Sequence, residues 1–291
     1  MSTSHYTLPD GRTLAYESYG DPQGFPVIGL HGLPGSRVWS VEEDKVAQKL
    51  GILLLTPDRP GYGQSTLRSG STFLAVADDI AAWTQGLGLS EFSIFGVSGG
   101  GVFAAAFASK YPHHLHKLGL VSTVNQFVKG RPPQGMAYAN RLTFKLARKA
   151  PWLLRIILAQ QARLIRKNPQ AFLQASLRPQ PHLCPSDQAV MALEENAQIM
   201  LAHLQAAYRQ GVKAAVAEAR LCTRPWGFEP QCIEVPTEMW HGEADTLSPV
   251  GPIKDLAAAM PKAKSHFLPE KGHFLTDEEE IWEQILVSLK K

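Results

Sequence analysis

Short apolar runs separated by longer amphipathic segments organise the first 124 residues of the chain. Four of these runs are almost wholly apolar, as strands are when both faces of their sheet are covered. They are residues 27–30, 52–55, 92–95 and 118–121. The segments between them have helical character. These are residues 41–50, 73–87 and 100–110. This alternation predicts an α/β fold with a mostly parallel, doubly wound sheet.

An alternating segment precedes the first buried run. Residues 6–19 alternate in polarity around Pro9-Asp10-Gly11. Because Asp-Gly favours the tight turn of a two-residue hairpin, this segment predicts a β-hairpin near the start of the chain.

The alternation of strands and helices stops after residue 124 and resumes near residue 231. The intervening segment is helical in character, basic, and interrupted by prolines such as Pro151. Strand-like runs and helices then return. They are strands at 237–240 and 265–268, and helices at 249–260 and 276–289. We therefore predict an α/β core formed by residues 1–124 and 231–291, with residues 125–230 inserted as a helical cap.

The composition of the 291 residues, with 44% hydrophobic and 19% charged side chains, provides for a large core and excludes a disordered or fibrous chain. The longest uncharged run, residues 92–109, approaches the length of a membrane span. Ser98-Gly99-Gly100-Gly101 interrupts it, so we interpret it as strand, turn and helix. Residues 1–5 lack the basic and apolar regions of a secretory signal, which predicts a cytoplasmic location.

Cysteine and tryptophan residues indicate no special chemistry. The cysteines, Cys184, Cys222 and Cys232, form no C-x-x-C pair and are expected to be reduced thiols rather than a disulfide framework or a metal site. Four tryptophans are assigned to packing in the core or cap. They are Trp83, Trp152, Trp226 and Trp240.

Charge is unevenly placed along the chain. No Asp or Glu occurs between Glu91 and Asp187, while that stretch carries thirteen Lys and Arg. Within residues 129–167 the cations interleave with apolar side chains, as in a basic amphipathic helix. One interpretation is the solvated face of a helical lid. The other is peripheral contact with an anionic membrane or an anionic substrate. No nucleic-acid partner is expected, because no recognised motif for one occurs.

A glycine-flanked serine follows one of the buried runs. Gly96-Val97-Ser98-Gly99-Gly100 lies between a predicted strand and a predicted helix, which is the context of a nucleophile elbow. The glycines let strand and helix approach closely while the serine, on a strained turn, keeps its hydroxyl exposed. A lone G-x-S-x-G also occurs in ordinary turns. Its place after a buried strand favours Ser98 as a nucleophile.

A serine hydroxyl needs a base to accept its proton and an acid to orient that base. Asp245 follows one late strand and His273 follows the next, so Ser98, Asp245 and His273 have the chain order expected with this elbow. The assignment stays open at two points, because Glu243 or Asp255 could supply the acid, and His273 taken alone could be a surface histidine.

A negatively charged intermediate also needs fixed hydrogen-bond donors. His31-Gly32-Leu33-Pro34-Gly35 follows an early buried strand and offers the backbone amide of Leu33. With the amide of Gly99, directly after the serine, it would form an oxyanion hole. The same residues are also compatible with a simple Pro-Gly turn.

Together these motifs resemble those of the α/β-hydrolase superfamily, over nearly all of the chain except the predicted cap. The motifs are His31 to Gly35, Asp58-Arg59-Pro60-Gly61-Tyr62-Gly63-Gln64-Ser65, Gly96 to Gly100, His241-Gly242-Glu243-Ala244-Asp245 and Gly272-His273. The resemblance implies a Ser-His-Asp hydrolase that uses no cofactor and no metal. It also implies that residues 58–65 form a structural turn beside the active site and that the cap shapes the substrate pocket.

The substrate depends on the cap, which is apolar and poor in acids, and this favours a carboxylesterase for a small to medium ester or lactone with a neutral or anionic acyl group. A rival hypothesis is an aminopeptidase similar to proline iminopeptidases, with Glu194, Glu195 or Glu218 holding the amine. Against it, Leu33 and Gly99 stand where those enzymes usually carry Gly and Trp. A carbon–carbon bond hydrolase and a non-catalytic receptor or scaffold are also compatible with the sequence. The sequence leaves the oligomeric state open.

Overall fold

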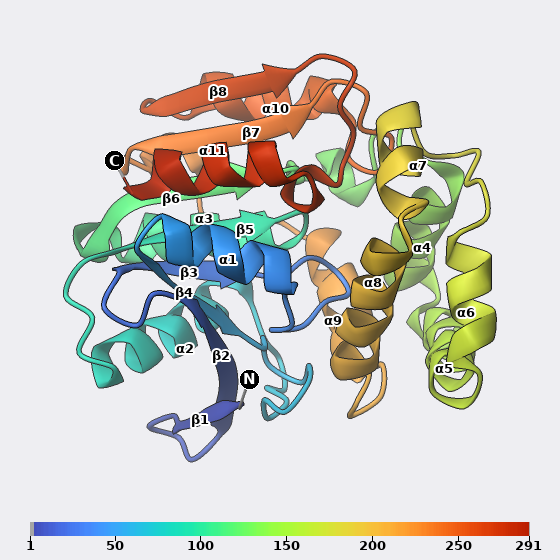
Figure 1. Ribbon diagram of the computed structural model, residues 1–291, viewed down its shortest axis with the longest axis horizontal. Coiled ribbons are helices and arrows are strands. Elements are labelled where there is room, and N and C mark those ends of the chain that lie inside the picture. Colours follow the sequence, from blue (N-terminus) through green and yellow to red (C-terminus); the bar gives the residue numbers. More distant parts are fainter. Residues whose placement is uncertain (1–2, 291) are drawn as a thin grey trace.

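The computed structural model describes residues 3–290 of the chain (Figure 1). Met1 and Ser2, which belong to the N-terminal stretch inspected for a signal, lie outside the described residues, as does Lys291. Within the described part, eight strands form one sheet in the order β1-β2-β4-β3-β5-β6-β7-β8. The strands are β1 (Ser4–Thr7), β2 (Thr13–Gly20), β3 (Phe25–Leu30), β4 (Ile52–Pro57), β5 (Phe92–Val97), β6 (Leu115–Val121), β7 (Thr237–Gly242) and β8 (Ala263–Leu268).

The predicted α/β fold is confirmed. Strands β3 to β8 pair in parallel, and the four apolar runs form the central strands β3, β4, β5 and β6. The predicted hairpin is β1 and β2, which pair antiparallel around a turn where Gly11 has φ +83°. Strand β2 then joins the sheet antiparallel to β4. The carboxyl ends of the parallel strands therefore meet at one edge, where the motif loops lie.

Helices cover both faces of the sheet. Helices α1 (Val41–Lys49) and α11 (Glu279–Lys290) lie in front of it in Figure 1, and their apolar side chains pack with Trp240 and Phe95. Helices α2 (Phe73–Gly86), α3 (Gly100–Lys110) and α10 (Val250–Ala259) pack in the core of the opposite face. Helix α11 begins later than the predicted start at residue 276, since Leu275–Asp277 forms a separate 3-10 turn.

A group of helices follows β6 and precedes β7 in the chain. In space it lies at the carboxyl ends of the strands (Figure 1). They are α4 (Tyr138–Lys149), α5 (Pro151–Lys167), α6 (Pro169–Ser176), α7 (Pro185–Met191), α8 (Glu194–Ala207) and α9 (Lys213–Cys222). We call α4 to α9 the cap. Pro151 separates α4 from α5, because proline is accommodated in the first turn of a helix and not in its interior. All six helices fall within residues 125–230, although those domain limits stay a prediction.

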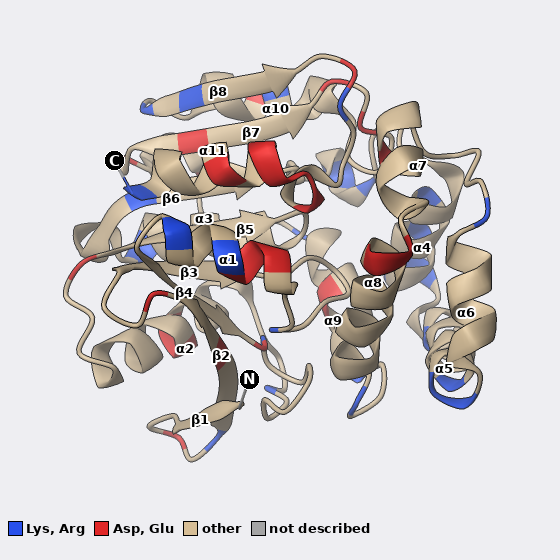
Figure 2. Ribbon diagram, viewed as in Figure 1, with Lys and Arg blue, Asp and Glu red and all other residues tan. Residues whose placement is uncertain are grey.

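Lysines and arginines mark α4 and α5, and neither helix contains an acidic residue (Figure 2). The uncharged run at 92–109 forms β5, a turn and most of α3, as expected. Among residues 3–290 we find no helix with both the length and the apolarity to cross a bilayer. The three cysteines are free thiols.

The packing prediction for the tryptophans is wrong for one of the four. Trp83, Trp226 and Trp240 are buried, whereas Trp152 is 67% exposed on α5. Apolar residues near Trp152 occur on several sides of the helix, so the sequence pattern does not reveal which side faces the core.

Candidate active site

Ser98 occupies the sharp turn between β5 and α3. Its φ is +53°, in the left-handed region, which costs a residue with a side chain about 1–3 kcal/mol and persists only where the surroundings enforce it. A Cβ atom at Gly96 would overlap the backbone of Gly100, and one at Gly100 would overlap the carbonyl oxygen of His31. The sequence thus folds here into a strained turn that requires glycine at positions 96 and 100.

Asp245 and His273 lie in contact beyond the ends of β7 and β8. His273 Nδ1 and Asp245 Oδ2 are 2.7 Å apart and share a hydrogen bond. The other oxygen, Asp245 Oδ1, accepts hydrogen bonds from the amides of Leu247 at 2.7 Å and Ser248 at 2.8 Å. Burial by itself lowers the pKa of His273, but the charge of Asp245 and this hydrogen bond outweigh it and raise that pKa. The arrangement holds the imidazole in place and favours its cation.

The two other candidate acids do not reach His273. Glu243 pairs with Lys254 at 2.7 Å, with both side chains partly exposed. Asp255 is exposed on α10 and lines a separate depression. Asp245 is therefore the candidate carboxylate that the fold brings to the histidine.

Ser98 and His273 line one cavity of about 420 Å³ between the core and the cap. Among the described residues no hydrogen bond joins the two side chains. The cap contributes Leu158, Met200 and His203 to the walls. The structure thus brings Ser98 and His273 to one cavity, while Asp245 contacts the Nδ1 side of the imidazole and leaves Nε2 without a hydrogen bond to Asp245.

The predicted oxyanion loop faces the elbow. Leu33 and Gly99 line a small space together with Ser98. A Cβ atom built on Gly99 would lie 3.0 Å from Leu33 Cβ and 3.9 Å from the Leu33 amide nitrogen. The two backbone segments therefore lie beside each other, and a side chain at Gly99 would crowd Leu33.

Arg59 supports the predicted oxyanion loop through the carbonyl oxygens of His31 and Gly32. Its guanidinium donates to the carbonyl oxygens of His31 and Gly32, the latter at 2.9 Å. His31 Nδ1 lies 2.9 Å from the same Gly32 oxygen, and His31 Nε2 accepts from the Arg59 amide at 3.2 Å. Burial favours the neutral imidazole and lowers the pKa of His31. These bonds fix the loop without using the amide of Leu33.

The same arginine connects the core to the cap. Arg59 forms two hydrogen bonds of 2.8 Å with the Glu218 carboxylate of α9. Burial opposes the guanidinium charge, but Glu218 outweighs it and raises the pKa of Arg59. Glu218 is thus occupied, and it is not free to hold a substrate amine. Glu194 and Glu195 are exposed at the start of α8 and do not line the cavity.

Replacing Glu218 with alanine should lower the free energy of unfolding by about 3–5 kcal/mol, because Arg59 would stay buried without its counter-ion. Urea unfolding followed by circular dichroism measures this. As a control, Glu283→Ala removes the exposed pair with Lys49 and should cost no more than about 1 kcal/mol. Equal losses in the two variants would contradict a stabilising role for the buried pair.

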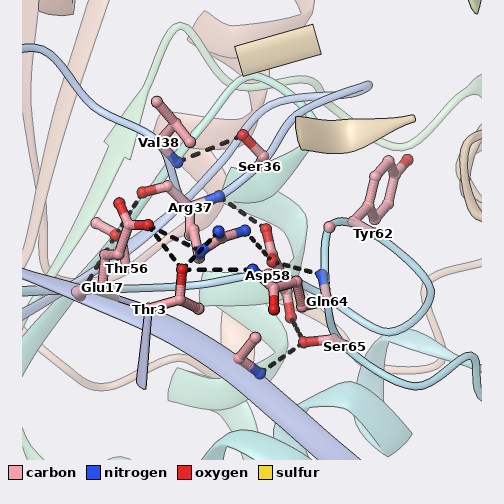
Figure 3. A network of polar contacts seen from close by, with 12 residues as sticks. Thr3, Glu17, Ser36, Arg37, Val38, Thr56, Asp58, Tyr62, Gln64 and Ser65 are labelled. Atoms are coloured by element: carbon pink, nitrogen blue, oxygen red, sulfur yellow. Dashed lines mark hydrogen bonds and ion pairs between the residues drawn. The ribbon is translucent and has the colours of Figure 1, made fainter. Parts of the chain in front are cut away.

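A buried polar network anchors the turn that carries Arg59 (Figure 3). The Asp58 carboxylate accepts hydrogen bonds from the backbone amides of Arg37 at 2.9 Å and Gln64 at 3.0 Å. It also accepts one from the Arg37 guanidinium at 2.7 Å. Arg37 also pairs with Glu17 at 3.0 Å. Ser65 Oγ donates to the Asp58 carbonyl oxygen at 2.7 Å. Residues 58–65 thus form a structural turn.

Asp187, on α7 of the cap, holds the loop that carries His273. Asp187 Oδ1 accepts hydrogen bonds from the backbone amides of His273 at 2.7 Å and Phe274 at 3.1 Å. Asp187 is 1% exposed. A Cβ atom at Gly272 would overlap this carboxylate, which explains the glycine before the histidine. The sequence carries no signal that links residue 187 to residue 273, so this contact could not be predicted.

Two acids line the same cavity, Glu43 of α1 and Asp277 of the 3-10 turn. Burial, together with the nearby charge of Asp277, raises the pKa of Glu43 above its usual range. An anionic acyl group would meet these carboxyl groups. Burial raises the pKa of Glu43 to about 8 and that of Asp277 to about 6, so Asp277 is the one of the two that is mostly ionised at neutral pH. No cluster of three or more His, Cys, Asp or Glu among residues 3–290 is placed to hold a metal.

Comparison with known proteins identifies the family of this fold. A family model described as the alpha/beta hydrolase fold matches residues 26–280, and the chain belongs to this family. It is similar to a proline iminopeptidase of Xylella fastidiosa, with 35% identity over 120 residues, 38% of this chain and 36% of that protein. It is also similar to lipase 1 of Psychrobacter immobilis, with 29% identity over 130 residues, 43% of this chain and 40% of that one.

The matched part spans less than half the length of these curated relatives. Among solved structures, a thermophilic esterase from Thermogutta terrifontis aligns over 100% of both chains, with a TM-score of 0.67 and 23% identity. Such a likeness shows the fold that the two chains share.

Proposed function

We propose that the protein is a serine hydrolase that cleaves carboxylic esters or lactones of small to medium size. The observation that carries this proposal is the 2.7 Å hydrogen bond between Asp245 and His273 at a cavity that Ser98 also lines. An oriented imidazole beside a serine on a strained turn is the arrangement that activates a hydroxyl. Similarity to lipases and esterases supports the same class of reaction.

In the proposed mechanism, His273 Nε2 accepts the proton of Ser98 as Ser98 Oγ attacks the substrate carbonyl carbon. The amides of Leu33 and Gly99 bind the oxyanion, and Asp245 stabilises the imidazolium. The tetrahedral intermediate collapses to an acyl-enzyme, and the alcohol leaves with the proton from His273. Water, deprotonated by His273, then attacks the acyl carbon and releases the acid and Ser98. No cofactor takes part in these steps.

Cavity size and lining restrict the substrate. A volume of about 420 Å³ lies near the lower end of the usual range for small-molecule sites. Leu33, Leu158 and Met200 give it an apolar wall, while the charge of Asp277 disfavours an anionic acyl group. These features support a neutral acyl chain of short to medium length. A cytoplasmic location stays a prediction from the N-terminal residues.

A panel of p-nitrophenyl acyl esters tests the proposal. We expect hydrolysis with a maximum of kcat/KM at short or medium acyl chains, because longer chains would exceed the cavity. Absence of turnover at every chain length would contradict an esterase. A panel member with a carboxylate at the end of its acyl chain should react more slowly than its neutral counterpart of equal length.

An aminopeptidase is the second candidate, because Glu43 and Asp277 are acids at the cavity and a proline iminopeptidase is among the relatives. Its test uses the p-nitroanilide of L-proline beside p-nitrophenyl butyrate. Faster turnover of the anilide, with loss of that turnover in Asp277→Asn, would favour the aminopeptidase. Hydrolysis of the ester alone supports the esterase.

A further inference from the structure

Large apolar side chains are exposed mainly in one short part of the chain. Of the ten such residues found on the described surface, seven lie within residues 128–164. They are Val128, Tyr138, Leu142, Trp152, Ile156, Ile157 and Leu164. Singly exposed apolar residues are ordinary, but four of these seven, Trp152, Ile156, Ile157 and Leu164, lie on the one helix α5.

Helix α5 combines exposed apolar and cationic side chains on its outer side. At 100° per residue, Trp152, Ile156 and Arg163 point in nearly the same direction. The buried residues Leu154 and Ile165 lie on the opposite side of the helix. We call the outer side the α5 surface. It consists of Trp152, Arg155, Ile156, Arg163, Arg166 and Lys167, all of them exposed.

No acid neutralises these cations. Within residues 3–290, no carboxylate lies within ion-pair distance of any lysine or arginine of the α5 surface. A depression of about 520 Å³ adjoins it, between α5 and the junction of α8 and α9. Arg155, Arg163 and Arg166 line this depression together with Arg209 and Lys213, and no acid does. The depression is thus concave, and every charged side chain that lines it is a cation.

We propose that the α5 surface docks on an anionic lipid bilayer, with lipid headgroups in the depression and Trp152 and Ile156 among the acyl chains. Arginines bind phosphate oxygens while their stems lie along apolar material, and tryptophan favours the bilayer interface. A free anion would use the cations and leave Trp152 and Ile156 unexplained. A bilayer uses both kinds of side chain at once.

Docking at this surface would leave the catalytic cavity unobstructed. The same helix contributes Leu158 to the cavity, and at 100° per residue Leu158 projects from a different side of the helix than Trp152. The α5 surface contains none of the residues proposed for catalysis. The docking proposal and the proposed hydrolase activity therefore stand or fall separately.

Vesicle co-sedimentation of the full chain tests the proposal. At low salt we expect the protein to sediment with vesicles of phosphatidylcholine and phosphatidylglycerol and to remain in solution with phosphatidylcholine alone. Binding should weaken steeply as salt rises. Arg155→Glu/Arg163→Glu should reduce binding at least tenfold. Trp152→Ser/Ile156→Ser should reduce vesicle binding several-fold. Both variants should hydrolyse a soluble ester at the native rate. If the native chain shows no such activity, both should keep its melting temperature.

The matched control is Lys262→Glu/Lys264→Glu, which makes the same change in net charge at two exposed lysines of the core. It should bind vesicles nearly as well as the native chain. An equal loss of binding in the control would overturn the α5 surface as the docking site. So would absence of sedimentation with anionic vesicles at low salt. Full binding by Trp152→Ser/Ile156→Ser, with displacement by inorganic phosphate at constant ionic strength, would indicate a free-anion site instead.

Discussion

Replacing Ser98 with alanine should lower kcat for p-nitrophenyl esters by about 10⁶-fold, the loss typical of removing the nucleophile of such a triad. Without Oγ no acyl-enzyme forms, so His273 and the oxyanion loop have no attacking group to assist. The cavity and the strained turn would remain, since alanine removes a single atom. The measurement is the steady-state rate at saturating ester, with the melting temperature recorded beside it.

Thr143→Ala provides the matched control, because Thr143 lines the same cavity and its hydroxyl donates to the Ala139 carbonyl oxygen. It should keep kcat within a few-fold of the native value. Covalent labelling by a small fluorophosphonate, located by mass spectrometry, should appear at Ser98 in the native chain and in Thr143→Ala. A Ser98→Ala variant with native turnover would overturn the proposed nucleophile. Failure to label the native chain would favour a non-catalytic receptor or scaffold.

Much of the site was predictable because parallel strands meet at one edge. The loops after β3, β5, β7 and β8 carry short motifs, and the sheet order places their residues together without long-range information. The elbow is also a local feature, because its glycines and the φ of Ser98 depend on neighbours in the same turn. The family resemblance and the core helices followed from these local patterns.

Other features depend on contacts between distant segments. The choice of Asp245 over Glu243 and Asp255 required the path of the loop after β7, which places two backbone amides on one carboxylate oxygen. The pairing of Arg59 with Glu218 joins the core to the cap across a separation of 159 residues. A charged residue in a sequence does not reveal its partner, so Glu218 looked as free as the exposed Glu194.

The cap was the least predictable part for the same reason. Helix α5 is apolar on more than one side, so periodicity identifies the helix without showing which side packs on the core. Trp152 illustrates this, since it was assigned to packing and is 67% exposed. Conversely, Asp187 is a single acid at the end of a long basic stretch, and the structure makes it the support of the His273 loop.

Changing Asp245 to asparagine should lower kcat by about 10⁴-fold while leaving the fold intact. The carboxylate accepts from His273 Nδ1 and so leaves Nε2 free to take the serine proton. An amide can instead donate to Nδ1, which places the proton on Nε2, where the base must be unprotonated. The same change removes the negative charge that raises the pKa of His273. Without that charge, we expect burial to lower the pKa of His273.

This second effect can be observed in the pH profile of kcat/KM. His273 acts as a base only when deprotonated, so the native activity should fall as pH decreases through a pKa above the ordinary value of 6.5. In Asp245→Asn the residual activity should extend to lower pH. Glu243→Gln makes the same chemical change on the same loop, at a carboxylate paired with Lys254, and should move neither kcat nor the profile. The contrary result would be that Asp245→Asn lowers the rate but leaves the fall of kcat/KM at low pH where it is in the native chain. In that case Asp245 would support the loop and would not set the charge of His273.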